Sequence, residues 1–278
     1  MRREFGKNDP FKFILSKQQA WAMNNPISLD GSRNNAYVKE LKDNLFPPRI
    51  SQDLVKEFST GGHEMKKHML ALHSSSALAV NFFETWRTDP GLLDILANSL
   101  FNESGFQSIH FETSYPTGLL GTAPHLDIFL TGENAKPVAI EAKYTEPYSK
   151  VISRPKIAKS YFKEALWAGL PKSYSLLTRI HEGELVFQRL DAVQLLKHTL
   201  GLSKHFMAGF RLFLLWYDFP SEVASKMEKE IEVFINETRD EIDFQSLSYQ
   251  EAFLCLHEHR SVCPDYFAYM QERYFMTD

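Results

Sequence analysis

The sequence predicts an α/β fold, in which a β-sheet is covered by helices and preceded by a helical N-terminal extension. Two short apolar segments, residues 125–130 and 138–143, flank a tract that contains Gly, Asn and Pro, a pattern typical of a β-hairpin. Residues 210–217 are apolar at nearly every position, which favours a strand covered on both faces. Between the predicted hairpin and residues 210–217, apolar residues recur at the spacing of helices.

The composition is that of a globular protein. The chain has 278 residues, of which 44% are hydrophobic and 24% are charged, enough for one large domain or two small ones. We expect a helical extension over residues 1–60 and one domain over residues 61–278. Only two cysteines are present, which excludes a disulfide framework and favours a reducing cytoplasm. The N-terminus has no apolar core of the signal-peptide type and no apolar run is long enough to cross a bilayer, so we expect no membrane partner.

The first third of the chain is predicted to be mostly helical. Two short amphipathic helices are expected at Phe11–Ala22 and Ala36–Leu45, between segments that Pro and Gly interrupt. This extension either caps the domain or faces the substrate, and the sequence leaves both roles open. A longer helix is expected from about Glu64 to Trp86, and an apolar helix follows at Leu92–Phe101.

A strand is expected at Gln107–Glu112. Ile109 and Phe111 share one of its faces, and Glu112 lies on the other. If this strand runs antiparallel to the next one, Glu112 either joins an acidic face or remains a plain charge at the edge of the strand. Residues 114–123, which carry Pro and Gly, are expected to form a loop over that face, where they could contact a substrate.

Alternation along the hairpin brings three charged side chains to one face. Asp127 points away from its apolar neighbours in the first strand, and Glu141 and Lys143 point away from theirs in the second. When the strands pair with their apolar faces together, these charges meet on one side of the sheet. Two converging carboxylates suit a hard divalent cation such as Mg²⁺, and the lysine can reach the water or phosphate that the metal holds. The alternative is a salt-bridged cluster on a solvated face, which is ordinary in antiparallel sheets.

The second half of the chain is predicted to alternate helices and strands. Helices are expected at Lys156–Ala168, Asp191–Leu200, Ser221–Thr238 and Asp265–Tyr274. Strands are expected at Tyr174–Ile180, Phe210–Tyr217 and Phe244–Phe253. Asp191 is a plausible N-cap of its helix, within which Gln194 and Lys197 lie three residues apart and share a face.

The charge of the chain is unevenly distributed. The net charge of −4 argues mildly against a general nucleic-acid binder. From Lys150 to Arg211, however, eleven Lys or Arg and four Asp or Glu give a local net charge of +7, whereas the rest has 20 basic and 31 acidic residues, a net of −11. This basic window begins directly after the hairpin, where it suits binding of a phosphate backbone. The alternative is a set of helices with solvated lysines on their outer faces.

The hairpin also carries a resemblance. The hairpin motif, in which Asp127 is followed after a spacer by Glu141-Ala142-Lys143, resembles that of the PD-(D/E)XK nuclease superfamily. This superfamily has the restriction-endonuclease-like fold. In that pattern a proline stands before the aspartate, and here Pro124 lies three positions earlier. The flanking segments Leu72–Phe83 and Lys143–Glu146 look like a bacterial restriction-endonuclease-related subgroup. The resemblance covers roughly residues 60–260.

The resemblance implies a central mixed β-sheet flanked by helices and a metal-dependent endonuclease that hydrolyses DNA phosphodiester bonds in restriction or defence. Asp127 and Glu141, with the Ala142 carbonyl, would hold Mg²⁺ or Mn²⁺. Lys143 would orient or deprotonate the attacking water or stabilise the charge of the transition state, and Glu112 would extend the carboxylate set. A homodimer would cut both strands. The superfamily also suggests a helix glutamate and a later polar helix residue, for which the candidates are Glu64, Glu84 and Gln194.

Two other functions remain open. A nuclease-like module that binds nucleic acid or a protein without cutting would keep the fold and lack the chemistry. An α/β interaction protein with a salt-bridged hairpin would bind no divalent cation there. The segment with Cys255, His257, His259 and Cys263 does not have the usual spacing of a structural zinc site. We find no P-loop and no dinucleotide-binding motif.

Overall fold

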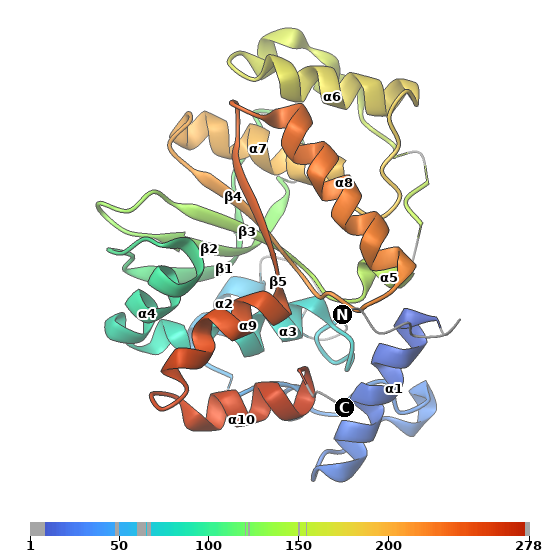
Figure 1. Cartoon of the computed structure of the whole chain (residues 1–278), viewed down its shortest axis with the longest axis vertical. Coiled ribbons are helices and arrows are strands. Elements are labelled where there is room, and N and C mark those ends of the chain that lie inside the picture. Colours follow the sequence, from blue (N-terminus) through green and yellow to red (C-terminus); the bar gives the residue numbers. More distant parts are fainter. Residues whose placement is uncertain are drawn as a thin grey trace.

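A five-stranded sheet lies across the middle of the molecule (Figure 1). The structure is a computed structural model, and it describes residues 9–47, 50–59, 65, 68–119, 121, 123–149, 151–153 and 155–275. Within these ranges the strand order is β1-β2-β3-β4-β5. The strands are β1 Ser108–Ser114, β2 His125–Thr131, β3 Val138–Lys143, β4 Arg211–Trp216 and β5 Asp243–Ser248.

The sheet is mixed, as predicted. β1, β2 and β3 form an antiparallel meander, whereas β3, β4 and β5 run parallel to one another. Parallel neighbours need a crossover, and the chain makes one through α6 and α7 between β3 and β4 and another through α8 between β4 and β5. The interior place of β4 explains its apolar sequence, because all residues from Leu212 to Trp216 are buried.

Helices cover both faces of the sheet. They are α1 Pro10–Asn24, α2 Gln52–Ser59, α3 Ser75–Phe83, α4 Pro90–Phe101, α5 Glu146–Ser149, α6 Pro171–Glu182, α7 Ala192–Phe206, α8 Glu222–Thr238, α9 Tyr249–Leu256 and α10 Pro264–Arg273. Figure 1 shows α6, α7 and α8 on one side of the sheet and α3, α4 and α9 on the other. No helix in the described ranges is long and apolar enough to cross a bilayer.

Two aromatic contacts identify which helix covers which face. Phe234 of α8 lies with its ring centroid 4.8 Å from that of Phe244, and Phe101 of α4 lies 5.2 Å from Phe213. Since Phe213 pairs with Gln245 across the ladder, Phe244 and Phe213 point to opposite faces. The helices α8 and α4 therefore cover opposite faces of the same sheet.

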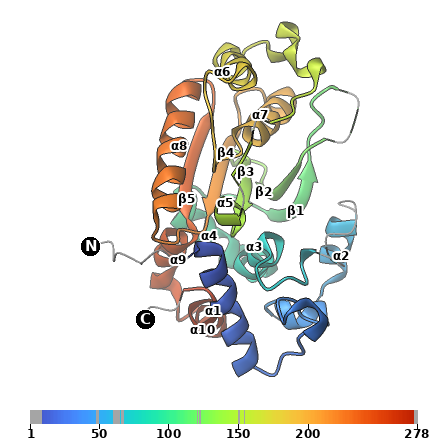
Figure 2. The ribbon, with the colours of Figure 1, turned by 90° about the vertical axis from the view of Figure 1, so that its right-hand side faces the viewer.

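The N-terminal segment packs against the last helix (Figure 2). Gln18 Nε2 of α1 donates to the Arg273 carbonyl at 2.8 Å, and the buried Arg273 guanidinium donates back to Gln18 Oε1 at 3.0 Å. Further along, Leu54 and Phe58 of α2 belong to the same continuous apolar core as the strands. Figure 2 shows α2 on the side of the molecule where β1 lies.

The predicted strand at Tyr174–Ile180 is wrong, because these residues belong to α6. Pro171 occupies the first turn of that helix and Gly183 ends it with a φ of 82°, which are signals of a helix start and a helix end. The buried residues of the segment, Leu176, Leu177 and Ile180, also follow helical spacing.

Other expected elements differ in extent. The helix expected from Glu64 begins only at Ser75, where the Ser74 hydroxyl caps it, and Glu64 itself lies outside the described residues. Ala36–Leu45 is not an α-helix but contains isolated bridges and a 3₁₀ turn at Leu41–Asn44. The predicted helix at Lys156–Ala168 is instead two 3₁₀ turns, η5 Lys159–Phe162 and η6 Glu164–Trp167.

The last strand is shorter than predicted. β5 ends at Ser248, where the serine and Glu251 form a reciprocal capping box that starts α9. This local signal ends the strand within the predicted range Phe244–Phe253. The helices expected at Phe11–Ala22, Leu92–Phe101, Ser221–Thr238 and Asp265–Tyr274 are confirmed within a few residues.

Candidate functional site

The site begins where β2 and β3 separate. Their ladder pairs Ile128 with Ile140, so the next pair in that register would be Asp127 with Glu141. At this point the Asp127 carboxylate takes the place of a backbone carbonyl of β2 as hydrogen-bond acceptor. Its Oδ2 accepts a hydrogen bond from the Ala142 N–H at 2.7 Å. The hairpin predicted from the sequence is present, and its separation leaves two carboxylates side by side at its end.

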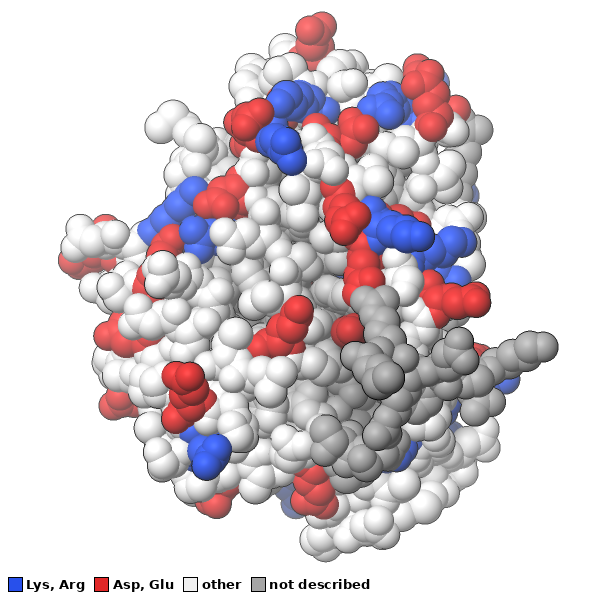
Figure 3. Space-filling model, in the orientation of Figure 1, with Lys and Arg blue, Asp and Glu red and all other residues white. Residues whose placement is uncertain are grey.

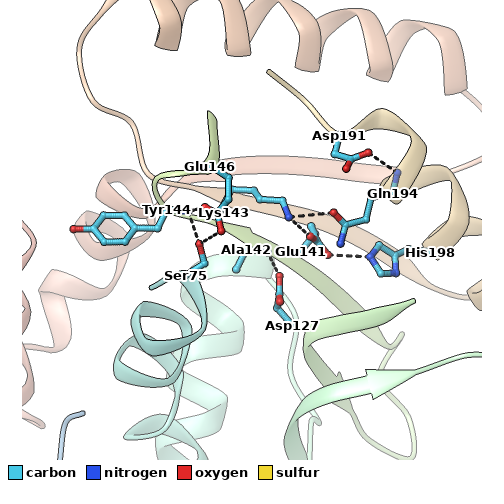
Figure 4. A network of polar contacts seen from close by, with 10 residues as sticks. All are labelled: Ser75, Asp127, Glu141, Ala142, Lys143, Tyr144, Glu146, Asp191, Gln194 and His198. Atoms are coloured by element: carbon cyan, nitrogen blue, oxygen red, sulfur yellow. Dashed lines mark hydrogen bonds and ion pairs between the residues drawn. The ribbon is translucent and has the colours of Figure 1, made fainter. Parts of the chain in front are cut away.

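Glu141 is the buried centre of a polar network (Figure 4). Its side chain is 2% exposed. Its Oε1 forms an ion pair with Lys143 Nζ, and its Oε2 accepts from His198 Nε2 at 2.9 Å. Lys143 Nζ also donates to Gln194 Oε1 at 3.1 Å. Both oxygens of Glu141 therefore have a partner, one from its own strand and one from α7.

The electrostatics differ sharply between the two carboxylates. Burial alone would raise the pKa of Glu141, but the Lys143 charge and the His198 hydrogen bond outweigh it and lower the pKa to about 2. For Asp127, burial and the neighbouring Glu141 charge raise the pKa well above its ordinary value, in spite of Lys143. Burial would lower the pKa of Lys143, but Glu141 and Asp127 prevail and raise it. The single ammonium thus stabilises Glu141 as a carboxylate and leaves Asp127 short of positive charge.

This donor set fits a hard divalent cation. Ala142 N–H points toward Asp127, and because the N–H and C=O of one strand residue face the same neighbour, the Ala142 carbonyl also faces the gap between β2 and β3. Two carboxylates and a carbonyl supply only oxygen ligands, as Mg²⁺ prefers, with water or phosphate completing its shell. No group of three or more His, Cys, Asp or Glu side chains in the described chain is placed to hold a metal by itself.

Glu112 lies on β1 beside this centre. The β1–β2 ladder pairs Phe111 with Ile128 and Thr113 with Leu126, so Glu112 stands between those pairs, at the level of Asp127. Its backbone is left-handed, with a φ of 52°, which interrupts the regular strand that the sequence predicts. Its carboxylate lies 3.8 Å from His125 Nδ1 and contributes to the raised pKa of Asp127. Glu112 therefore stands at the level of Asp127, and its negative charge acts on the Asp127 carboxyl.

Of the two candidate helix glutamates, Glu84 lies elsewhere, and Glu64 lies outside the described residues. Glu84 forms an ion pair with Arg87 at 2.7 Å and accepts from Ser51 at 3.5 Å. Arg87 in turn pairs with Glu57 of α2, so these residues form a separate cluster. Gln194, by contrast, contacts Lys143 directly.

Sequence reasoning missed two parts of the network. His198 lies four residues after Gln194 on α7, so both face the hairpin, and this i, i+4 spacing is a signal that could have identified the pair. Ser75 and Glu146 form the second part, since the Tyr144 N–H donates to Ser75 Oγ at 3.0 Å and to Glu146 Oε2 at 2.9 Å. These contacts fix the chain directly after Lys143.

Most of the chain matches a known protein family. A family model described as Restriction Endonuclease associating with ARP matches residues 15–275. No curated protein and no solved structure matches the chain.

Proposed function

Because the chain belongs to the family described as Restriction Endonuclease associating with ARP, we propose that it is a nuclease of the PD-(D/E)XK type that hydrolyses DNA phosphodiester bonds with Mg²⁺ or Mn²⁺. The observation that carries this proposal is the placement of Asp127, Glu141 and Lys143 at the point where β2 and β3 separate. Their pattern in the sequence resembles that of the superfamily, and their geometry offers oxygen ligands beside an ammonium.

Each residue has a distinct role in the proposed reaction. Asp127 and Glu141, with the Ala142 carbonyl, would hold the cation, which supplies a water of lowered pKa and offsets negative charge on the phosphate. Lys143 carries a raised pKa, so it acts in its cationic form, orienting the water and stabilising the phosphate oxygens. Gln194 restrains the Lys143 ammonium, and Glu112 adds negative charge near Asp127.

Burial argues against a salt-bridged hairpin without chemistry. That alternative needs a solvated face, but α7 covers the face, and Glu141 is buried. A buried ion pair contributes little net stability, since removing both charges from water costs about as much as their attraction returns. The network is thus better explained by a chemical role than by a structural one.

The test is cleavage of supercoiled plasmid and of single-stranded DNA in Mg²⁺ or Mn²⁺ by the wild type, Lys143→Ala and Lys136→Ala. Lys136 is a matched control, because it also forms an ion pair, with Asp243 at 2.7 Å, at the other end of the hairpin. We expect metal-dependent nicking that Lys143→Ala loses and Lys136→Ala keeps. Equal activity in all three proteins would indicate a contaminant. Binding of DNA without any cleavage would favour the non-catalytic module.

We also propose a cellular setting and an assembly. Cys255 and Cys263 are both unpaired, which fits a reducing cytoplasm, where the enzyme would act in restriction or defence. Cutting of both strands would be served by a homodimer, which sedimentation of the protein with and without duplex DNA would detect.

A further inference from the structure

Eight cations of the basic window form two groups in the structure. Of the other three, Lys150 and Arg154 lie outside the described residues, and Arg189 donates to the Pro147 carbonyl at 2.9 Å. Lys172, Arg179 and Arg211 are neutralised by acids that lie outside the window in the sequence. The pairs are Lys172 with Asp240 at 3.1 Å, Arg179 with Glu237 at 2.6 Å, and Arg211 with Glu103 at 2.9 Å and Asp243 at 3.2 Å. Figure 3 agrees, since acidic and basic side chains alternate over the end of the molecule where α6 and α8 lie. The charges of these cations are therefore partly offset by neighbouring carboxylates, which makes them less attractive to a phosphate backbone than lysines without such a partner.

A second group forms no ion pair within the described residues, and we call it the lysine ridge. Its members are Lys156, Lys159, Lys163, Lys197 and Lys204. Four of them are exposed, and Lys197 is half-buried. The first three belong to the segment between α5 and α6, and the other two belong to α7.

Aromatic contacts hold the two parts of the lysine ridge together. Lys197 Nζ lies 5.5 Å from the centroid of the Tyr161 ring, which belongs to η5 between Lys159 and Lys163. Trp167 is buried, and its Nε1 donates to the Tyr161 carbonyl at 2.7 Å. The apolar residues of this segment point inward, so its lysines are presented outward from a fixed backbone.

The lysine ridge starts beside the candidate site. Lys197 lies one helical turn from Gln194 and next to His198, the two α7 residues that contact Lys143 and Glu141. Lys204 is seven residues further along and therefore lies on the same stripe of α7. Seven residues of helix span about 10.5 Å, close to the rise of about three nucleotides along one DNA strand.

Gly118 lies close to the far end of the lysine ridge. Gly118 has a φ of 79°, and a Cβ there would stand 2.5 Å from Lys204 Nζ. The absence of a side chain at Gly118 therefore lets the loop after β1 approach the Lys204 amine. The sequence predicts that this loop lies over the acidic face of the hairpin.

We propose that the lysine ridge binds the phosphate backbone of duplex DNA and leads one strand from α7 to the proposed cleavage centre. This inference rests on the proposed function, because it describes the substrate path of the same site. Unpaired, exposed ammonium groups on a fixed surface suit a polyanion, and each phosphate contact makes binding more dependent on salt. The neutralised cations of α6, at the same end of the molecule, contribute little.

The experiment compares two double variants that each remove two positive charges. Lys159→Ala/Lys163→Ala changes the lysine ridge, and Lys172→Ala/Arg179→Ala is the control, with charges that are ion-paired. Binding of a 30-base-pair duplex is followed by fluorescence anisotropy in EDTA over a series of salt concentrations. The logarithm of the association constant falls linearly with the logarithm of the salt concentration. For the ridge variant we expect this negative slope to become less steep by about 1.8, and the Kd in 0.1 M salt to rise about tenfold or more. The control should stay close to the wild type.

Equal losses in both variants would overturn the proposal, since they would show a general effect of net charge. An unchanged slope in the ridge variant, or no DNA binding by the wild type, would also overturn it. Because binding is measured without a divalent cation, its result is independent of cleavage. If the ridge variant binds DNA more weakly but the wild type does not cleave, the proposed nuclease activity is rejected and the DNA-binding role of the lysine ridge stands. If the wild type cleaves but the ridge variant binds DNA as well as the wild type, the nuclease activity stands and the role of the lysine ridge is rejected.

Discussion

Replacing Asp127 by asparagine should stabilise the metal-free protein while abolishing the proposed DNA cleavage. In the structure the Asp127 carboxylate lies beside Glu141, and Lys143 is bonded to Glu141 rather than to Asp127. An asparagine keeps an oxygen that accepts the Ala142 N–H, which Asp127 now accepts at 2.7 Å. The substitution therefore removes a repulsive charge and leaves the hydrogen bond in place.

The sign and the pH dependence follow from the raised pKa of Asp127, which is caused by burial and by the Glu141 charge. A carboxyl whose pKa is raised on folding favours the folded state below its unfolded pKa and loses that contribution as the pH rises toward its folded pKa. The advantage of Asp127→Asn should therefore grow as the pH rises from about 4. A single stabilising substitution is commonly worth about 0.5–2 kcal/mol, or a few degrees in Tm for a chain of this size.

The assay is thermal unfolding in EDTA and in Mg²⁺ at pH 5 and pH 8, together with plasmid cleavage. Asp243→Asn is the matched control. Although burial raises the pKa of Asp243, the hydrogen bond from Lys136 and the charge of Arg211 lower it overall, so this variant should lose stability at pH 8. The reasoning is refuted if Asp127→Asn unfolds at a lower temperature than the wild type in EDTA at pH 8. It is equally refuted if Mg²⁺ raises the Tm of that variant as much as it raises the Tm of the wild type.

Two further predictions concern buried hydrogen bonds. His198→Ala removes the only α7 donor to Glu141 Oε2 in the described chain. It should lower the free energy of unfolding, measured by urea titration, by about 1–3 kcal/mol, and it should also reduce cleavage. His198→Gln should recover part of the stability and part of the cleavage. Arg273→Met should cost about 3 kcal/mol or more, because the guanidinium donates to Gln18 Oε1 at 3.0 Å and to Asn44 Oδ1, and these two buried oxygens have no other donor within the described residues. An Arg273→Met protein as stable as the wild type would show that this cluster adds no net stability.

The sequence is most informative where the pattern is local. Strand alternation places Asp127, Glu141 and Lys143 on one side of the hairpin, and the structure has them together because pairing of Ile128 with Ile140 sets the register. The apolar run of β4 likewise predicts an interior strand. Such features depend on residues that are close in sequence, so periodicity alone can identify them.

Sequence periodicity does not predict contacts between segments that are distant in the chain. His198 approaches Glu141 from 57 residues away, and its place follows from how α7 crosses the sheet rather than from the composition of α7. Burial of Glu141 is likewise a tertiary effect, and for this reason alternation alone favours a solvated cluster of charges over a buried site. The error at Tyr174–Ile180 had another cause, since a short apolar segment suits both a strand and a helix unless its Pro and Gly boundaries are weighed.

The strongest argument for a bound cation is an imbalance of charge rather than the motif itself. Within the described residues, Glu141 has two partners, whereas the Asp127 carboxylate accepts one hydrogen bond, from a neutral amide. A network that served stability alone would gain from an apolar residue at Asp127, because buried ion pairs are often replaced without loss. The unneutralised carboxylate lies where β2 and β3 separate and where the Ala142 carbonyl faces the gap. One ammonium does not balance two carboxylates, so a divalent cation at this point would complete the charge balance that the fold leaves open.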